Sequence, residues 1–343
     1  MRILLLLLVI CALSGYSREI IVNSRNSLVT AGEFVHTEIT PAGREIAKEL
    51  YDSLEVSDLM QRKTIQEAIL KKCKTWLDEH SVNRELLALS WLLEHMLKSQ
   101  DRSAPTYFSN PLEKAYYAFF TDNDCKRLKE YILYKYQLEG YDEQDPERMM
   151  RELNLLQRAL ILNSPMRPKW EPVDKIISEL NLHQGIKMAE AGCGQGFYTY
   201  RLSHLVGKEG IVYALDNDRG QIDFLQDFIN GEDIENVQAT RSTDESVMLT
   251  SNRVELFFYN QLYHLVYMYL PRQPRFKLIE SLRKAIRPNG RLVIVDRYPK
   301  SDTIGYSVDP RLIIGQLEFF GFKLIRQAEL GQELYLLEFE NIK

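Results

Sequence analysis

Two acids and three glycines near the middle of the chain form its most informative chemical pattern. The pattern begins at Glu190 and continues with glycines in alternate positions, at Gly192, Gly194 and Gly196. Asp216 follows at the end of the predicted strand 211–215. Glycine lets the backbone approach a ligand where a side chain would collide, and an acid after the next strand suits the two hydroxyls of a ribose. The pattern therefore predicts a nucleoside-binding site on an open α/β sheet.

The spacing of the glycines indicates which ligand fits such a site. A dinucleotide-binding turn reads G-x-G-x-x-G, whereas Phe197 stands at the third glycine position of this chain. A carboxylate at Glu190 would repel a pyrophosphate but attract a cation or an amine. A nicotinamide-dependent oxidoreductase is therefore disfavoured. A strand-to-helix turn without a ligand is the structural alternative.

The form E-x-G-x-G-x-G with a later acid resembles motif I of class I S-adenosylmethionine (SAM) methyltransferases. Three further segments carry the same resemblance. Residues 167–173 are similar to an opening segment with a Trp-x-x-Pro element, residues 259–264 to a TYHH segment, and residues 286–299 to the segment LRPGGRLVIVDF. The resemblance covers roughly residues 167–339. It indicates a methyltransferase type 11/25-like domain, in a branch of the exported type.

Two positions depart from the family pattern. Asn289 stands where the family usually has glycine, and Leu265 stands where the TYHH segment has its second histidine. The first change is mild, because asparagine tolerates turn conformations. The second weakens any mechanism that relies on two histidines.

The resemblance implies SAM as the cofactor and assigns residues to its parts. The three glycines would give backbone access to the methionine part, and Glu190 would hold the amino group through water. Asp216 would bind the ribose hydroxyls. Asp244 would accept a hydrogen bond from the adenine amine, unless it is only a turn acid. Asn260 would lie beneath the sulfonium, and Tyr198 would line the pocket.

Methyl transfer from SAM needs an aligned acceptor and, for some acceptors, a base. His264 is the candidate base, because histidine has an unperturbed pKa of about 6.5. A packed or surface histidine is the alternative. Tyr263 would shape the acceptor pocket. Asp296 and Arg297 would orient a polar acceptor or form a surface ion pair.

Two hypotheses about function are therefore favoured over an oxidoreductase. The first is a SAM-dependent methyltransferase that acts on a small-molecule or lipid-like acceptor. The alternative is a protein that binds SAM but is catalytically degenerate and serves regulation or scaffolding. The family spans many substrates, so the resemblance indicates the cofactor and the fold far better than the acceptor.

Strands and helices alternate in the second half of the chain. The predicted strands lie near 187–191, 211–215, 236–241, 254–259, 291–296, 322–328 and 333–339. The predicted helices lie near 171–181, 197–206, 218–230, 274–287 and 309–320. The alternation predicts a mostly parallel sheet covered on both faces, and the short turn at Gly331 makes the last two strands antiparallel. The fold class is therefore α/β, a Rossmann-like methyltransferase sheet with an antiparallel final strand.

An all-α N-terminal domain is predicted to precede this sheet. Two prolines in the segment Asn163–Pro168 interrupt the helical pattern, which predicts a helical domain at 18–165 and a methyltransferase domain at 166–343. Apolar residues recur near the helical period before this segment. The helical domain carries no chemical motif. It is either a scaffold or a cap that selects the acceptor.

The first residues have the pattern of a secretory signal. Met1 and Arg2 precede an apolar run from Ile3 to Leu13, which is shorter than the roughly 20 residues that span a bilayer. Small residues near Ser14 fit a cleavage site. Residues 1–17 are therefore predicted to be a signal peptide or an anchor. The protein would then be exported (periplasmic or secreted) or held near a membrane, and it would be cytoplasmic if the segment is not a signal.

The composition is that of a globular chain. The 343 residues are 45% hydrophobic and 27% charged, which is enough for one large or two ordinary domains. The net charge of −5 and the lack of a basic motif disfavour nucleic acid as a partner. The expected partner is a small-molecule acceptor, and no oligomeric state is predicted.

The cysteines predict neither a metal site nor a disulfide framework. No Cys/His cluster has zinc spacing, and the three cysteines after the predicted leader are an odd number, which argues against a framework of bridges. Cys73 and Cys125 are predicted core residues. A bridge between them in an oxidising compartment is the alternative.

Overall fold

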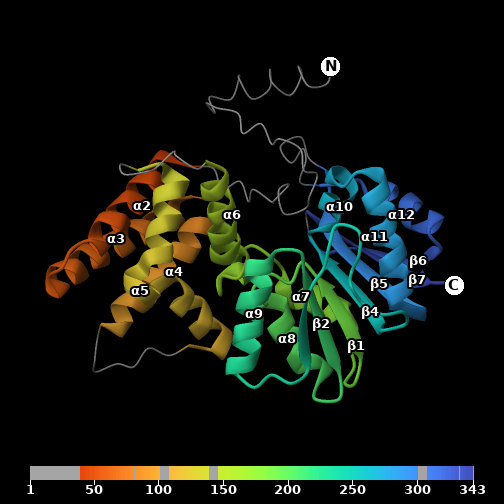
Figure 1. The fold of residues 1–343 in the computed structure, drawn as a ribbon. Helices are drawn as coiled ribbons and strands as arrows, with labels where there is room; N and C mark the ends of the chain where they lie inside the picture. Colours follow the sequence, from red (N-terminus) through yellow and green to blue (C-terminus); the bar gives the residue numbers. More distant parts are fainter. Residues whose placement is uncertain are drawn as a thin grey trace.

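The computed structural model describes residues 39–80, 82–100, 108–138, 146–299, 307–331 and 333–342. These residues form a helical domain and an α/β domain that lie side by side (Figure 1). The predicted leader at residues 1–17 lies outside them. Within these ranges, no helix has the length and apolarity needed to cross a bilayer.

The helical domain is built around one apolar core. Its described helices are α2 (Pro41–Leu54), α3 (Leu59–Glu79), α4 (Arg84–Ser99), α5 (Pro111–Tyr136) and α6 (Pro146–Leu162). Four of them begin at a side chain that accepts a hydrogen bond from a backbone N–H of the first turn: Thr40, Asp58, Asn83 and Asn110. Such caps satisfy N–H groups that a helix start leaves without partners.

Helix α5 is broken in the middle, and the break orients its first half. Asp122 leaves the helical region, and the next three residues, Asn123 to Cys125, have φ angles of 53°, 55° and 57°. Asparagine and aspartate tolerate left-handed backbone better than other non-glycine residues, whereas it is costly for Cys125. Across the break, the Arg127 guanidinium donates a hydrogen bond of 3.1 Å to the carbonyl of Phe119. The chain therefore changes direction at a defined point.

The first half of α5 joins the two domains. Leu112 belongs to the core of the α/β domain, and the rings of Phe119 and Phe224 meet edge to face at 5.4 Å. A β-carbon added at Gly220 would lie 3.4 Å from the side chain of Leu155 on α6. Residues of α5 and α6 thus pack against the α/β domain, and Figure 1 shows α6 on the side of the helical domain that faces it.

The α/β domain contains a seven-stranded sheet in the order β3-β2-β1-β4-β5-β7-β6. Its strands are β1 (Lys187–Ala191), β2 (Ile211–Asp216), β3 (Val237–Arg241), β4 (Val254–Asn260), β5 (Ile286–Arg297), β6 (Phe322–Glu329) and β7 (Leu334–Asn341). Strand β7 is antiparallel to both β5 and β6, and the strands from β3 to β5 are parallel. The predicted fold class, with the helical region before the sheet, is confirmed.

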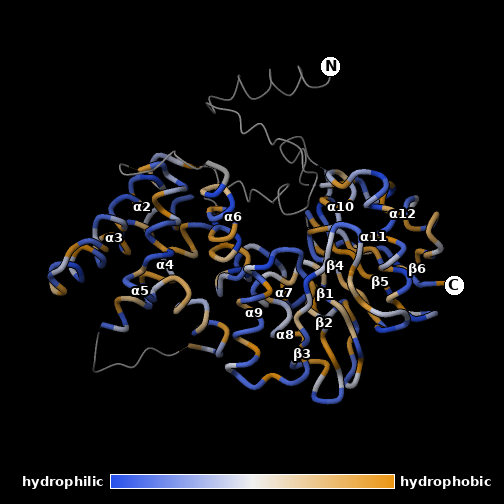
Figure 2. Tube along the Cα trace, viewed as in Figure 1, coloured by the Kyte–Doolittle hydropathy of each residue, from blue (hydrophilic) through white to orange (hydrophobic). Residues whose placement is uncertain are grey.

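Helices cover both faces of this sheet (Figure 1). One layer contains α7 (Val173–Glu179), α8 (Phe197–Val206) and α9 (Arg219–Gly231), and the other contains α10 (Tyr263–Tyr269), α11 (Arg272–Ala285) and α12 (Pro310–Phe319). A short 3₁₀ helix, η1 (Arg167–Lys169), precedes α7. Figure 2 shows hydrophobic residues along the central strands, as a sheet buried on both faces requires.

Two sequence predictions need correction. The helix predicted at 274–287 ends at Ala285, because Ile286 already pairs with Val254 in the sheet. The alternative of a bridge between Cys73 and Cys125 is wrong, since both are free and buried. Asn289 has a φ of 61°, so asparagine occupies the left-handed backbone that the usual glycine would adopt.

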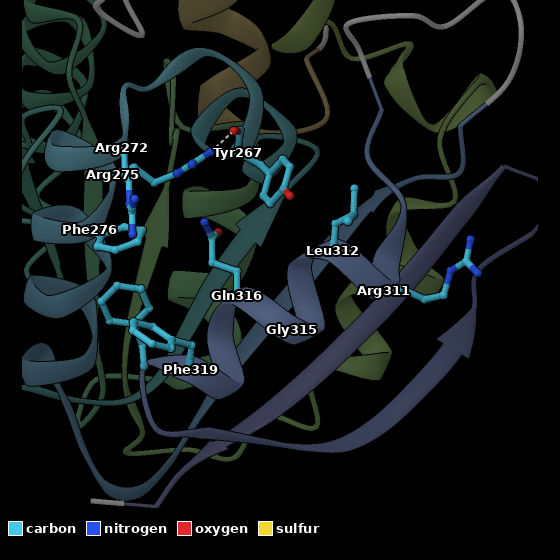
Figure 3. Close-up of a pocket in the computed structure, with 10 residues that line it drawn as sticks. Tyr267, Arg272, Arg275, Phe276, Arg311, Leu312, Gly315, Gln316 and Phe319 are labelled. Atoms are coloured by element: carbon cyan, nitrogen blue, oxygen red, sulfur yellow. Dashed lines mark hydrogen bonds between the residues drawn. The ribbon is translucent and has the colours of Figure 1, made fainter.

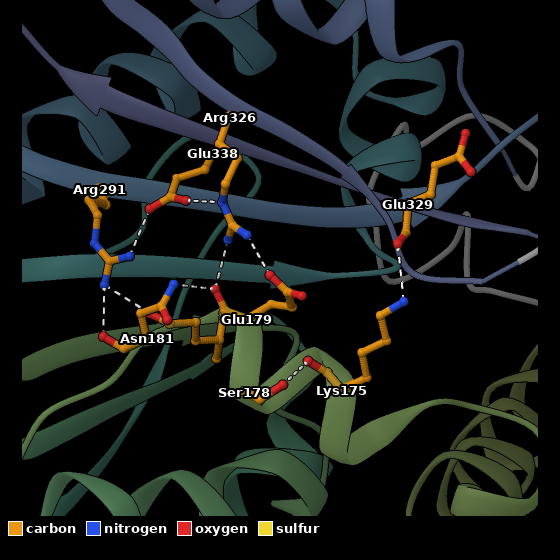
Figure 4. Close-up of polar contacts among 9 residues, drawn as sticks. Lys175, Ser178, Glu179, Asn181, Arg291, Arg326, Glu329 and Glu338 are labelled. Atoms are coloured by element: carbon orange, nitrogen blue, oxygen red, sulfur yellow. Dashed lines mark hydrogen bonds and ion pairs between the residues drawn. The ribbon is translucent and has the colours of Figure 1, made fainter.

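A buried ion network fixes α7 against the outer strands (Figure 4). The carboxylate of Glu338 accepts hydrogen bonds of 2.7 Å from both Arg291 and Arg326. The Arg326 guanidinium also pairs with Glu179 at the end of α7. Glu338 is only 5% exposed, so its buried charge is paired with both arginines.

Neutralising this carboxylate should destabilise the protein. Glu338→Gln removes the acceptor charge from two arginines, and hydrogen bonds to charged groups contribute about 1.5–3 kcal/mol each. We expect a loss of roughly 1–3 kcal/mol in the free energy of unfolding, measured by urea denaturation. Asp223→Asn is the control, because its pair with Arg219 is exposed at the surface and should contribute less than about 1 kcal/mol. Equal urea midpoints for the two variants would contradict the account.

Candidate active site

The glycine turn joins β1 to α8, and its backbone requires glycine. The φ angles of its three glycines are 69°, 54° and 99° in chain order. A β-carbon at Gly192 would come within 2.6 Å of the Leu262 side chain, and one at Gly196 within 2.7 Å of Leu225. Side chains would therefore collide at the first and third positions. At Gly194 the nearest atom would be 3.5 Å away, on Asn163, so the middle position has more room.

Asp216 lies against this turn, as predicted. Its carboxylate accepts hydrogen bonds from the backbone N–H groups of Gly194, at 3.0 Å, and Asp218, at 2.9 Å. Burial raises the pKa of Asp216, and the charge of Arg158 on α6 opposes that shift. The Asn217 amide donates to Asp244 at 3.2 Å. The structure therefore brings Asp216, Asp244 and the glycine turn together.

Glu190 is buried beneath the same turn. It is 3% exposed, and the Thr199 hydroxyl donates a hydrogen bond of 2.6 Å to its carboxyl group. Burial, helped by the neighbouring charge of Asp216 and opposed by Thr199 and Arg167, raises the pKa of Glu190 to about 8. The carboxyl group is thus largely protonated at neutral pH when no cation lies beside it.

Glu171 links two predicted residues that the sequence did not connect. Its carboxylate forms a 2.7 Å ion pair with Arg167 and accepts hydrogen bonds from Tyr198, at 2.5 Å, and Asn260, at 2.9 Å. Burial alone would raise the pKa of Glu171, but Arg167 and these donors outweigh burial and hold the pKa below its usual value. The signal for this cluster was the four-residue spacing of Arg167 and Glu171.

Buried polar atoms without partners surround the glycine turn. Within the described residues, Gln195 Nε2, both side-chain polar atoms of Gln221 and Asn260 Oδ1 make no hydrogen bond. Gln221 Oε1 would lie 3.9 Å from a β-carbon at Gly194. Native proteins satisfy most buried polar atoms, so these atoms fit a site that a polar ligand completes. Their donors and acceptors suit the amino-acid and nucleoside parts of SAM.

His264, at the start of α10, and Asp296, near the end of β5, form a buried pair. His264 Nδ1 lies 2.9 Å from Asp296 Oδ1, and the backbone N–H of His264 donates to Asp296 Oδ2 at 2.8 Å. The side chains are 2% and 0% exposed. A carboxylate at Nδ1 holds the proton there and orients Nε2 as a proton acceptor. Asp296 shares a face of β5 with Leu292 and Ile294, which belong to the core beside α10–α12. The histidine is therefore packed toward that layer, and its predicted role as a base stays a prediction.

Tyr263 lies apart from the cofactor cluster. Its ring is fully buried in the core between the sheet and α10–α12, and its hydroxyl donates to Gln316 at 2.9 Å. Side chains alternate between the faces of a strand. Met188, Ala214 and Phe258 face α7–α9, so Glu190, Asp216 and Asn260 face that layer too. The predicted role of Tyr263 in an acceptor pocket stays a prediction.

The helical domain brings a positive charge to this edge of the sheet. Burial and, after it, the charge of Arg297 at the end of β5 together lower the pKa of Arg84, at the start of α4, to about 10. Arg84 also interacts electrostatically with Glu171 and Arg167. Arg297 itself donates to Gln261 at 2.7 Å. A residue of the first domain thus faces the site of the second.

Comparison with known proteins gives a match to a protein family, over the part of the chain that contains the glycine turn. Residues 189–294 match the model of a protein family described as a methyltransferase domain. No curated protein matches the chain. The match to the family supports SAM as the cofactor of this domain.

Solved structures include similar folds. A SAM-dependent methyltransferase from Aquifex aeolicus is 24% identical with a TM-score of 0.47, and the match covers 53% of this chain and 95% of that one. A TehB-like SAM-dependent methyltransferase from Corynebacterium glutamicum is 18% identical with a TM-score of 0.39, and covers 49% and 87%.

The raised pKa of Glu190 predicts how stability changes with pH. Between the ordinary value of 4.5 and about 8, the unfolded chain releases this proton while the folded chain retains it. The contribution of Glu190 to stability therefore falls as pH rises through that window. Glu190→Gln should gain stability relative to the wild type from pH 5 to pH 8, measured by urea denaturation at both values. A difference that does not change with pH would contradict the assignment.

Proposed function

We propose that residues 166–343 are a SAM-dependent methyltransferase of the exported-type branch, acting on a small-molecule or lipid-like acceptor. The observation that carries the proposal is a set of buried polar atoms without partners, on Gln195, Gln221 and Asn260, beside a glycine turn that donates a backbone N–H to Asp216. The methyltransferase domain match over residues 189–294 supports it.

Different residues around the turn would bind different parts of the cofactor. Each oxygen of Asp216 accepts one backbone N–H, which leaves lone pairs for the ribose hydroxyls. Glu190 would hold the amino group, and Asn260 Oδ1 would face the methionine part. Asp244 would accept from the adenine amine. When bound, SAM supplies an activated methyl group, so the chain has to align an acceptor and, for some acceptors, remove a proton.

We propose that His264 removes this proton and that Asp296 is its positioning residue. The support is the 2.9 Å contact at Nδ1 between two buried side chains. The helical domain would act as a cap that selects the acceptor, since Arg84 interacts electrostatically with Arg297 beside the His264–Asp296 pair. Its charge would favour an acceptor with an anionic or strongly polar group.

The location of the protein is proposed from its first residues. The basic residue, short apolar run and small residues of positions 1–17 support export or attachment to a membrane. N-terminal sequencing of the protein from its natural host should find a start near Gly15 or Arg18. Recovery of Met1 on soluble protein would reject this proposal.

Cofactor binding should release a proton. Glu190 is largely protonated without a ligand, and the cationic amino group of SAM would favour its charged form. Calorimetry at pH 7 in two buffers of different ionisation enthalpy should detect release of up to about one proton per SAM bound. Glu190→Gln should bind without release.

The same titration tests the position of the cofactor. Gly194→Arg should abolish binding, because its side chain would extend over Asn163 and Gln221. Gly231→Arg is the matched control, since a β-carbon there meets nothing within 4 Å. Equal affinity in both variants would place the cofactor elsewhere.

The base proposal is tested by turnover. Once a screen with labelled SAM has identified an acceptor, His264→Gln should lower kcat by about 10²–10⁴-fold while affinity for S-adenosylhomocysteine stays near that of the wild type. Asp296→Asn should lower kcat less and leave KM for the acceptor unchanged, as a positioning role requires. Full turnover in His264→Gln would reject the role of His264 as a base and leave it as a packed residue only. A wild type that binds SAM but methylates nothing in a broad screen would favour the degenerate alternative.

A further inference from the structure

An open pocket of 420 Å³ lies in the α10–α12 layer, away from the cofactor cluster (Figure 3). Its walls come from the end of α10, the first turns of α11, and α12. The size is within the range of small-ligand pockets, about 300–1,000 Å³. The residues assigned to the cofactor face α7–α9 on the other side of the sheet, so this pocket needs an explanation of its own.

Positive charge dominates the lining of this pocket. Three arginines and no acid line it: Arg272, Arg275 and Arg311. The charge of Arg311 is compensated, because Asp309 accepts two hydrogen bonds from its Nε, at 3.0 and 3.1 Å. Among the described residues, neither Arg272 nor Arg275 forms an ion pair, and Arg275 Nε is buried without any hydrogen-bond partner. The pocket therefore holds two positive charges that no described acid neutralises.

Aromatic rings hold these two arginines in place. The Arg272 guanidinium lies 5.2 Å from the centre of the Phe276 ring, and that of Arg275 lies 5.1 Å from the Tyr267 ring. Arg275 also donates a hydrogen bond to the carbonyl of Tyr267. Stacking on rings restricts a guanidinium without using its charge for an ion pair. Both groups are thus ordered before any anion arrives.

The rest of the lining is apolar and partly open to solvent. Phe276 packs against Phe320 at 5.0 Å and Phe319 at 6.1 Å. Phe319 is nevertheless 76% exposed, and Leu312 is 49% exposed. Both line the pocket from α12, and Figure 3 shows them on the same helix as Gly315 and Gln316. Large exposed apolar side chains beside a pocket often mark a binding site.

We propose that this pocket binds a small organic anion with an alkyl or aromatic body. The anionic group would pair with Arg272 and Arg275. The body would cover Phe276, Phe319 and Leu312. Charge complementarity decides the class of ligand, because a cationic or neutral ligand of the same size would leave both guanidinium groups without a counter-charge.

Gly315 offers a way to close the pocket without disturbing the core. A β-carbon there meets nothing within 4 Å, and leucine favours a helix more than glycine does. Gly315→Leu should therefore fold and fill the space. Gly231→Leu, at the end of α9, is the matched control because its β-carbon also meets nothing within 4 Å.

The test compares octanoate with octylammonium and acetate by isothermal titration of the full chain. Octanoate should bind the wild type and Gly231→Leu equally, and Gly315→Leu at least about tenfold more weakly. Arg272→Gln should also lose about tenfold, which keeps the test valid if circular dichroism shows Gly315→Leu misfolded. Octylammonium and acetate should bind the wild type more weakly than octanoate.

Three results would overturn the proposal. Octylammonium could bind as tightly as octanoate, which would remove the role of charge. Octanoate could bind Gly315→Leu or Arg272→Gln as tightly as the wild type, which would place it elsewhere. The wild type could bind only vesicles that contain phosphatidylglycerol and no monomeric octanoate, which would make this face a membrane-docking surface instead. None of these results depends on whether the chain binds SAM.

Discussion

The buried carboxylate of Glu171 is the interaction on which the geometry of the candidate site depends. It joins Arg167 of η1 to Tyr198 on α8 and Asn260 at the end of β4. Removing a buried charge from its partners is costly, so the charge of Glu171 requires all of these groups to stay in place. The glycine turn leads directly into α8, and Gly192 lies against Leu262 just after β4, so the cluster holds elements that border the turn.

The helical domain completes the environment of that cluster. The break in α5 directs Phe119 onto Phe224 of α9, and α6 brings Arg158 close to Asp216. Arg84 of α4 adds its charge at the opposite end of the same edge. The two domains therefore share one polar boundary, and the electrostatics of the candidate site belong to both. This arrangement gives the helical domain a physical reason to affect whatever binds at the sheet edge.

Local rules were enough to predict the sheet and to single out the glycine turn and Asp216, which the structure brings together. A glycine turn, an acid that ends a strand and the alternation of short strands with helices can all be read from neighbouring residues, so Gly192 and Asp216 could be singled out from the sequence. Glu171 could not, because its partners Tyr198 and Asn260 lie 27 and 89 positions away. The layer that Tyr263 faces depends on the short helix α10, which no periodic pattern predicted. The break in α5 was also missed, since its left-handed residues carry no glycine signal.

The most direct test of the account is which adenosine-containing ligand stabilises the fold. Thermal unfolding of the protein should be followed with S-adenosylhomocysteine and, separately, with NAD⁺. A ligand present at about 100 times its Kd adds roughly 2.7 kcal/mol to the free energy of unfolding, so S-adenosylhomocysteine should raise the Tm by several degrees and NAD⁺ should not. A rise with NAD⁺ and none with S-adenosylhomocysteine would contradict the assignment of the glycine turn to SAM.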